Sequence, residues 1–184
     1  MRLCQEGLVQ VIPRRGYLIT PITVKDVLEI FESRMALEPA IARLAAGRVN
    51  ESELVRADLR WAQSYAASDR YVDDSALQGN KDFHLQIAEA TGNVRLVQMQ
   101  ARILDETDRL IYLGLPIAND RSEIQEGHKS LIKALASGDS AAAELEAARH
   151  VEIAKAIVLD AVMSSPSIMR AELTVQRHKT GTNA

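Results

Sequence analysis

The strongest constraint on the fold is a helical repeat that begins at Thr23 and is broken at short intervals by helix-ending residues. Apolar side chains recur every three or four positions, which places them on one face of a helix. Capping residues open each segment and glycines close most of them. We therefore predict an all-α antiparallel bundle of about six helices. They span residues 23–46, 50–68, 73–91 (or from 74), 93–114, 119–137 (or from 122) and 139–163.

The composition agrees with such a bundle and also indicates the cellular compartment in which the protein works. Hydrophobic residues make up 47% of the chain but aromatics only 4%, which favours close-packed helices. The single cysteine, Cys4, excludes an internal disulfide framework and predicts a reducing, cytoplasmic compartment. No apolar run approaches the roughly 20 residues of a membrane span, and no signal-peptide pattern opens the chain. A net charge of −3 gives no overall footprint for nucleic acid.

The first residues follow a different pattern. Residues 8–20, "LVQVIPRRGYLIT", are two β-rich runs on either side of a turn, which predicts a short β-hairpin with Arg14 and Arg15 at its tip. Before it, "MRLCQEG" is typical of the last turn of a helix ending at Gly7, so the chain is expected to begin partway through a structural unit. On composition alone, a hairpin that packs on the bundle is the favoured interpretation.

Three of the four histidines fall on inward-facing stripes of the predicted helices. His84 shares its face with Asn80, four residues earlier, whereas Asp82 points the other way. His128 and His150 each lie among apolar residues at core spacing on later helices. One such histidine alone is more often an ordinary hydrogen-bonded core residue. Three on separate helices of one bundle favour a shared site.

Metal binding explains this arrangement best. Neutral imidazole is the commonest protein ligand for zinc and also suits nickel, copper and iron. Asn80 adds a carbonyl oxygen from the His84 face. Three imidazoles and an amide leave the +2 charge of the ion uncancelled, so the site is expected to attract a carboxylate, or otherwise water.

Arg34 is the second candidate, in the middle of the first apolar stripe, which also includes Leu44. One interpretation is an ordinary ion pair with Glu38, four residues on. The other is a guanidinium that faces a cavity and holds a carboxylate through two hydrogen bonds. The sequence does not separate them. Gln100 and Thr107 are weaker candidates for the same cavity.

Catalysis has less support. An open metal position can activate water, but such chemistry also needs a general base nearby. The chain has no HExxH pair, nucleophile elbow or glycine-rich phosphate loop. We expect a binding domain and no enzyme. Two alternatives stay open, a metal-dependent, hydrolase-like enzyme on the same bundle and a metal-free bundle with ordinary core histidines.

Four segments carry a family resemblance: "SRMALEPAIARLAA", "NKDFHLQIAEATGN", "GHKSLIKALASGD" and "AARHVEIA". In this order they resemble the C-terminal effector-binding domain, the FCD domain, of FadR-type GntR transcription regulators. The resemblance covers residues 23–163. Residues 1–22 are similar to the end of that family's winged helix-turn-helix, with the last turn of the recognition helix and the wing hairpin. Residues 164–184 are expected to form a flexible tail.

The resemblance implies roles for particular residues. The expected metal ligands, for zinc or nickel, are Asn80, His84, His128 and His150. Asn80 departs from the family's usual aspartate, which puts metal affinity and identity in question. A small organic acid is the implied effector, with its carboxylate held by the metal and by Arg34. Arg14 and Arg15 would contact operator DNA in the intact regulator, which is expected to be a homodimer. Without the groove-reading helix, the chain alone is expected to bind DNA weakly.

Overall fold

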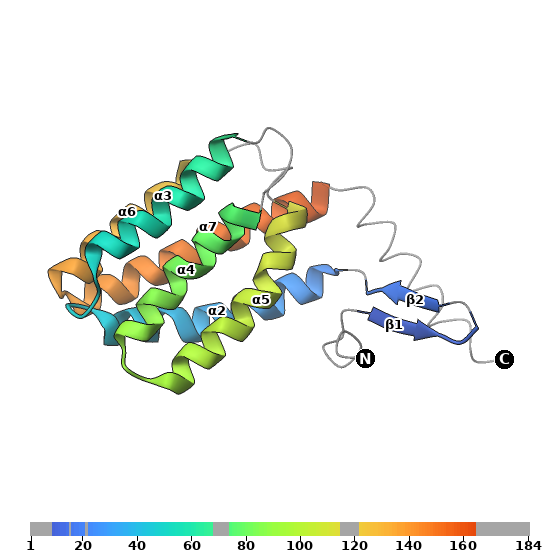
Figure 1. Cartoon of the computed structure of the whole chain (residues 1–184), viewed down its shortest axis with the longest axis horizontal. Coiled ribbons are helices and arrows are strands. Elements are labelled where there is room, and N and C mark those ends of the chain that lie inside the picture. Colours follow the sequence, from blue (N-terminus) through green and yellow to red (C-terminus); the bar gives the residue numbers. More distant parts are fainter. Residues whose placement is uncertain (1–8, 15, 21, 68–73, 115–121, 165–184) are drawn as a thin grey trace.

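The computed structural model describes residues 9–14, 16–20, 22–67, 74–114 and 122–164, and it is a six-helix bundle preceded by a two-stranded hairpin (Figure 1). The predicted fold class is confirmed, and the helix ends agree with the sequence prediction to within a few residues. The turn before Gly7, Arg15 and the tail from residue 165 lie outside the described residues. The elements are β1 (Val9–Ile12), β2 (Gly16–Ile19), α2 (Val24–Ala45), α3 (Glu51–Ala67), α4 (Asp74–Ala90), α5 (Val94–Gly114), α6 (Ser122–Ser137) and α7 (Ser140–Ser164).

Local signals account for the helix ends. At the start of α2, the Asp26 amide donates to Thr23 Oγ1 at 3.1 Å while the Thr23 amide donates to Asp26 Oδ2 at 2.8 Å, so two free amides are satisfied reciprocally. After α2 and α6 the chain turns through Gly47 and Gly138, at φ of 74° and 75°. These left-handed conformations suit glycine. The Gly47 amide also donates to the Leu135 carbonyl at 2.8 Å, which joins the ends of the two helices.

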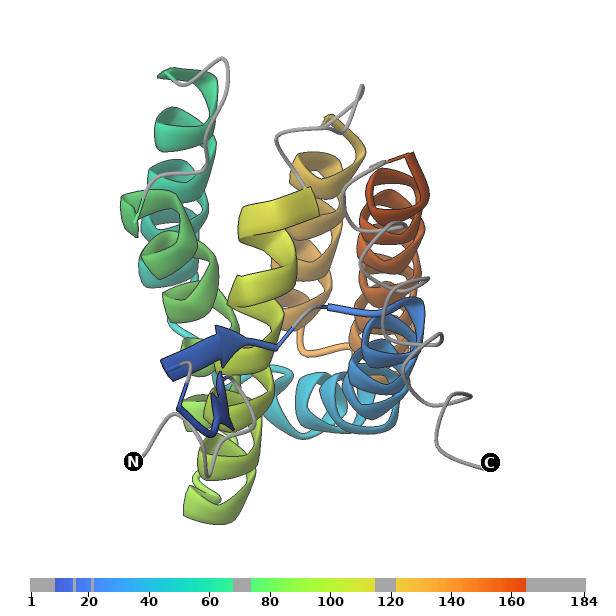
Figure 2. The same cartoon turned by 90° about the vertical axis from the view of Figure 1, so that its right-hand side faces the viewer.

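The helices pack as antiparallel neighbours. α2 lies along α7, α3 pairs with α4, and α6 pairs with α7. α2 also contacts α4, α5 and α6, which places it at the centre of the helix contacts. Figure 2 shows the bundle end-on, with α3 and α4 at one side and α2 and α7 at the other. No helix in the described ranges is both long and apolar enough to cross a bilayer.

The apolar core is divided into two clusters by polar side chains. Along α7, Ala147 belongs to one cluster and Val151 to the other, with His150 between them. Along α2, Arg34 occupies the equivalent place between Phe31 and Leu37. Because both interruptions are buried, the polar groups lie inside the bundle and not at its surface.

One residue that the sequence places on the buried face of α2 is exposed in the structure, so that prediction is wrong. Leu44 is 42% exposed, whereas Ala42 and Ala45 are buried in its place. In the last turn of α2 the helix approaches its neighbours closely through small side chains. The bulky leucine is therefore the residue that faces solvent.

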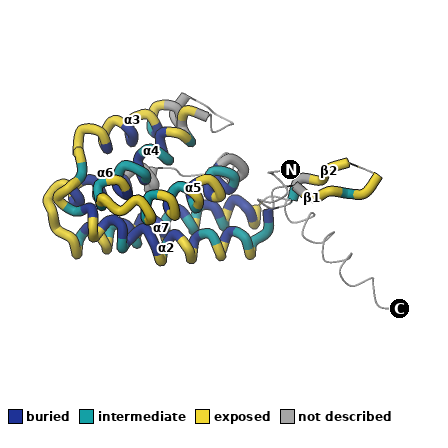
Figure 3. The backbone as a smooth tube through the Cα atoms, turned by 60° about the horizontal axis from the view of Figure 1, so that its bottom comes forward, coloured by how far each residue is buried: buried dark blue, intermediate teal, exposed yellow. Residues whose placement is uncertain are grey.

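The hairpin stands apart from the bundle. β1 and β2 pair antiparallel with Ile12 opposite Gly16, and Pro13 and Arg14 lie in the turn between them. Arg14 lies there, exposed and at a φ of 64°. Among the described residues neither strand contacts a helix, and Figure 3 shows the hairpin as mostly exposed. The two strands therefore do not pack on the bundle. The segment is joined to it at its end, because Arg109 of α5 donates a hydrogen bond to the carbonyl of Thr20, directly after β2.

Candidate metal centre

The structure brings together the three histidines that the sequence places on inward stripes. His84 from α4, His128 from α6 and His150 from α7 are all buried. Each offers one ring nitrogen, and these three atoms lie within 4.8 Å of one another. The ring centroids are 4.6 Å apart for His128 and His150 and 5.7 Å apart for His84 and His128. Three imidazoles so close together form one cluster.

The cluster contains polar atoms with no hydrogen-bond partner. They are His84 Nε2, His128 Nε2, His150 Nδ1 and Asn80 Nδ2, all buried. Buried polar atoms are nearly always paired, so four unpaired atoms in one place call for a ligand. Turning the Asn80 amide over would offer its oxygen instead, because the two ends of an amide have the same shape. Three imidazole nitrogens and an amide oxygen fit zinc or nickel. A zinc ion binds imidazole nitrogen at about 2.0–2.1 Å.

Two buried carboxylates orient two of the imidazoles. Asp58 Oδ1, on α3, lies 2.8 Å from His128 Nδ1. Glu38 Oε2, on α2, lies 3.4 Å from His84 Nδ1. In both rings Nε2 is left as the unpaired atom. Phe83 also stacks on the His128 ring, with centroids 4.2 Å apart and planes at 23°, which restricts its rotation.

Sequence reasoning missed the part played by Asp58. The signal was nevertheless available, because Leu54, Asp58 and Trp61 follow the i, i+4, i+7 spacing of a buried stripe on α3. A carboxylate at such a position needs a buried partner. The structure identifies this partner as His128, from a helix far along the chain.

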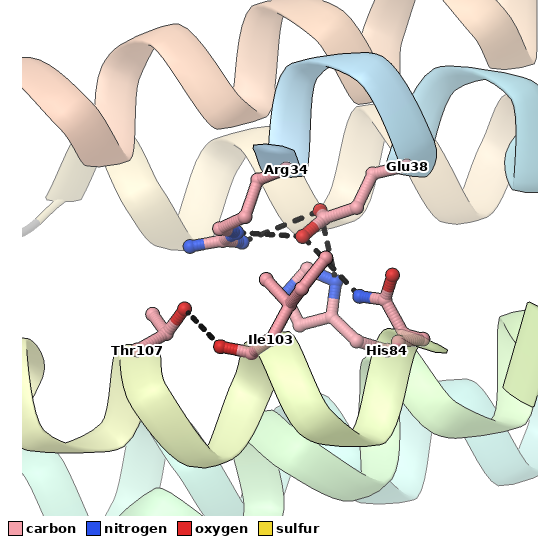
Figure 4. A network of polar contacts seen from close by, with 6 residues as sticks. Arg34, Glu38, His84, Ile103 and Thr107 are labelled. Atoms are coloured by element: carbon pink, nitrogen blue, oxygen red, sulfur yellow. Dashed lines mark hydrogen bonds and ion pairs between the residues drawn. The ribbon is translucent and has the colours of Figure 1, made fainter. Parts of the chain in front are cut away.

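Arg34 forms the ion pair with Glu38, and its side chain also lines a cavity. Its Nε donates to Glu38 Oε1 at 2.6 Å and its Nη2 to Glu38 Oε2 at 3.3 Å, so the ion pair exists, but it is buried (Figure 4). Gln100 Nε2 donates to the same carboxylate at 3.2 Å. Arg34 also lines a cavity together with Asn80 and His150. Thr107 instead donates to the Ile103 carbonyl of its own helix.

Burial decides the charge states of the site. It lowers the pKa of His84 to about 3, although Glu38 opposes the shift. Burial also lowers the pKa of His150, and His128 and His84 lower it further. For Glu38, burial raises the pKa, but Arg34, His84 and the hydrogen bonds from Arg34 and Gln100 together bring it below its usual value. His84 and His150 are therefore neutral at pH 7, which is the form that binds metal, and Glu38 is ionised.

The cavities beside the histidines are small. The one lined by Arg34, Asn80 and His150 has a volume of about 20 Å³, and the one lined by Glu38, His84 and Gln100 about 10 Å³. Each has room for about one water molecule. Aromatic and aliphatic side chains complete the first, namely Phe31, Trp61, Ile111, Ala154 and Val158. A roomier hollow of about 180 Å³ lies between α2 and α5, but Asp26, Glu29 and Glu106 make it unsuitable for an anion.

Taken together, the fold and the cluster define a class of protein. It is a six-helix domain with unpaired imidazole nitrogens at its buried centre and a guanidinium that lines a small cavity beside them. Residues 29–153 match the family model described as the FCD domain, and the chain belongs to this family. The predicted resemblance is confirmed.

Known relatives agree with this assignment. The chain is 26% identical over 153 residues to the HTH-type transcriptional repressor RspR of Escherichia coli K12, covering 83% of this chain and 67% of that protein. A GntR transcriptional regulator from Rhodococcus sp. RHA1 has a similar structure, with a TM-score of 0.67 and 21% identity over 87% of this chain and 76% of its own. The metal-free FCD domain of TM0439 aligns with a TM-score of 0.59 and 17% identity, over 79% of this chain and all of that one (100%). The two structural likenesses show the fold alone.

Proposed function

We propose that residues 23–163 form the ligand-sensing domain of a transcription regulator and that its sensing centre contains a zinc or nickel ion. The ligands in this proposal are Asn80, His84, His128 and His150. The observation that carries it is the set of unpaired nitrogens of three buried imidazoles within 4.8 Å of one another, in a domain whose relatives are named transcriptional repressors. One structural neighbour is described as a metal-free FCD domain, which makes metal occupancy the first property to test.

The proposed effector is a small organic acid. Three neutral imidazoles and an amide do not cancel the charge of a divalent ion, so a bound metal would supply an electrophilic position for a carboxylate oxygen. Arg34 lines the adjoining cavity, and its contacts with Glu38 use only some of its five N–H groups. The others are available to a second oxygen of the ligand. At about 20 Å³ the cavity has room for one water molecule, so a compact acid would have to displace side chains that line it, such as Phe31 and Trp61.

We further propose that residues 1–22 belong to a DNA-binding unit and that Arg14 and Arg15 contact the phosphate backbone or minor groove of operator DNA. The exposed position of Arg14 and the separation of the hairpin from the bundle support this role. We expect residues 1–184 by themselves to bind DNA weakly, through the backbone contacts of the hairpin. A tight, sequence-selective gel shift by residues 1–184 would overturn this part. We expect a cytoplasmic homodimer, with residues 164–184 as a flexible tail.

The enzymatic alternative gains no specific support. Among the described residues, Glu38 and Asp58 are the carboxylates paired with these imidazoles, and each is already engaged, Glu38 by Arg34 and Asp58 by His128. A general base needs a carboxylate that can reach a bound water. The names of the relatives also describe regulators of transcription.

The metal is tested by mass spectrometry of protein purified without a histidine tag. About one zinc or nickel per chain is expected in the parent and none in a His128→Ala, His150→Ala double variant. A parent that stays metal-free after incubation with either ion would overturn the proposal.

The effector is tested by a thermal-shift screen of small carboxylic acids on the metal-loaded protein. A true effector should raise the melting temperature of the parent and lose most of this effect in Arg34→Gln. Arg43→Gln is the matched control, because Arg43 forms a half-exposed pair with Glu144 at 3.7 Å. An acid that acts equally on both variants does not bind at Arg34.

A further inference from the structure

The carboxylate of Asp58 differs from every other charged group at the centre. It is 6% exposed and lies on α3, which supplies none of the proposed metal ligands. Its partner is His128 Nδ1, at 2.8 Å. In the described part of the chain no lysine or arginine is paired with it. A buried carboxylate held only by an imidazole is costly unless that imidazole carries, or is bound to, positive charge.

Glu38 does not provide the same charge. It also lies beside an imidazole, that of His84, but at the longer distance of 3.4 Å. The Arg34 guanidinium, bonded to both of its oxygens, cancels its charge. Glu38 and Arg34 together are neutral, so Asp58 is the negative charge at the centre that no lysine or arginine of the described residues compensates.

The proposed ligand set makes such a charge useful. Asn80 is neutral, and so are imidazoles that bind a metal, so a divalent ion there would retain its full +2 charge in a buried place. A carboxylate that accepts the remaining N–H of a metal-bound histidine fixes the tautomer and orientation of the ring. It also raises the basicity of the ring, and its loss typically costs 10- to 100-fold in metal affinity.

We propose that Asp58 is a positioning residue that holds His128 with its proton on Nδ1 and Nε2 free for the metal. From α3 it supplies the negative charge that the neutral Asn80 does not bring. The inference rests on the proposed metal centre and adds to it Asp58 and the helix that carries this residue, α3. Phe83 restrains the same ring by stacking, so Asp58 selects which ring nitrogen faces the metal site while Phe83 limits the tilt of the ring.

The variant Asp58→Asn removes the negative charge of the side chain but keeps its shape. The amide oxygen still accepts a hydrogen bond from Nδ1, but the negative charge is gone. Competition with a chromophoric chelator should show zinc affinity falling about 10- to 100-fold in Asp58→Asn, and at least as far in Asp58→Ala. Asp82→Asn is the control, since Asp82 pairs with Arg60 on the outer face of α4, and its affinity should equal that of the parent.

Adding Asn80→Asp to Asp58→Asn tests the charge itself. A carboxylate returned at residue 80 should recover most of the lost affinity, a rescue that a purely structural role for Asp58 would not produce. If the double variant remains as weak as Asp58→Asn, the assignment of the charge to Asp58 is overturned. If Asp58→Asn binds zinc as tightly as the parent, the whole inference fails while the metal centre stands. If the parent binds no metal, the proposed function fails with it.

A measurement on the unaltered protein covers the case in which the variants do not fold. Nitrogen-15 NMR of the histidine rings of the metal-free protein reports which nitrogen carries the proton. We expect His128 to be protonated on Nδ1 with Nε2 bare. A proton on Nε2 with Nδ1 bare would contradict the proposed role of Asp58.

Discussion

Glu38 joins more of the buried network than any other single residue described here. Its carboxylate meets Arg34 of its own helix, Gln100 of α5 and His84 of α4 (Figure 4). Removing one partner of a buried pair leaves the other charge without compensation, which is far more costly than never having had the pair. The residue-scale consequences of the network are therefore large and can be measured one side chain at a time.

The first prediction concerns Glu38→Gln. The substitution keeps the shape but leaves the buried Arg34 guanidinium without its counter-charge. We expect the free energy of unfolding of the metal-free protein to fall by about 3–5 kcal/mol in urea denaturation. Glu29→Gln is the control, since its pair with Lys25 is exposed and its loss should change stability by no more than about 0.5 kcal/mol. Similar values for both variants would mean that burial of the pair is not what matters.

The second prediction is an acid-sensitive stability in the metal-free protein. Native His84 has a pKa of about 3 because of burial, whereas an unfolded histidine titrates near 6.5. Between these values the unfolded chain binds more protons, so the stability is complete above about pH 6.5 and is lost as the pH falls towards 3. From pH 7.5 to 5.0 the loss due to His84 is about 2 kcal/mol.

Urea denaturation at both pH values checks this. His84→Gln should lose less stability on acidification than the parent, by about that amount, since glutamine does not titrate. His150, with its pKa lowered in the same direction, should keep part of the acid sensitivity in this variant. An identical pH dependence in parent and variant would contradict a depressed pKa at His84.

At the scale of elements, the contact between α3 and α4 decides whether the site forms. Gly79 lies one residue before Asn80, and a Cβ atom there would approach the Trp61 amide nitrogen to 2.8 Å and the Ala57 carbonyl oxygen to 3.2 Å. These are backbone atoms, which cannot rotate away. The close approach allowed by this glycine keeps α3 against the helix that carries Asn80 and His84.

The third prediction is therefore that Gly79→Ala destabilises the protein by about 1–3 kcal/mol, as overpacking does. In an uncrowded helix the same change would instead stabilise by about 0.5–1 kcal/mol, so the sign alone is informative. Thermal and urea denaturation measure it. Glu89→Ala, at an exposed position of α4, is the control and should have little effect. A more stable Gly79→Ala protein would show that the helices separate without cost.

For the whole molecule, the main feature is that every helix contributes a buried polar side chain to the centre of the bundle. The contributing residues are Arg34 and Glu38 from α2, Asp58 from α3, Asn80 and His84 from α4, Gln100 from α5, His128 from α6 and His150 from α7. A metal bound there would connect α4, α6 and α7. Its binding should therefore stabilise the bundle as a unit.

The fourth prediction follows from this linkage. Zinc added to the chelator-treated protein at a free concentration of about 100 times its Kd should stabilise the fold by about 2.7 kcal/mol at pH 7.5. Burial holds the pKa of His84 near 3 and lowers that of His150, so protons should compete with the metal for these two imidazoles only well below pH 6, and most of the gain in melting temperature should persist down to about pH 5. In the His128→Ala, His150→Ala variant zinc should have no effect. An equal gain in that variant would place the binding elsewhere on the chain.

The sequence by itself determined the helices and the inward direction of the histidines. Thr23, Gly47 and Gly138 mark helix ends through local backbone chemistry, and periodicity alone assigns His84, His128 and His150 to buried faces. These signals act within a few residues and can be read without the fold.

Only the tertiary structure decided which inward polar groups meet. Asp58 and His128 are 70 positions apart, and Glu38 and Gln100 are 62 apart. Such pairs depend on the packing and rotation of whole helices, which periodicity does not specify. The same uncertainty made Leu44 a wrong assignment and left Arg34 open between an ion pair and a cavity wall, when in the folded chain it is both.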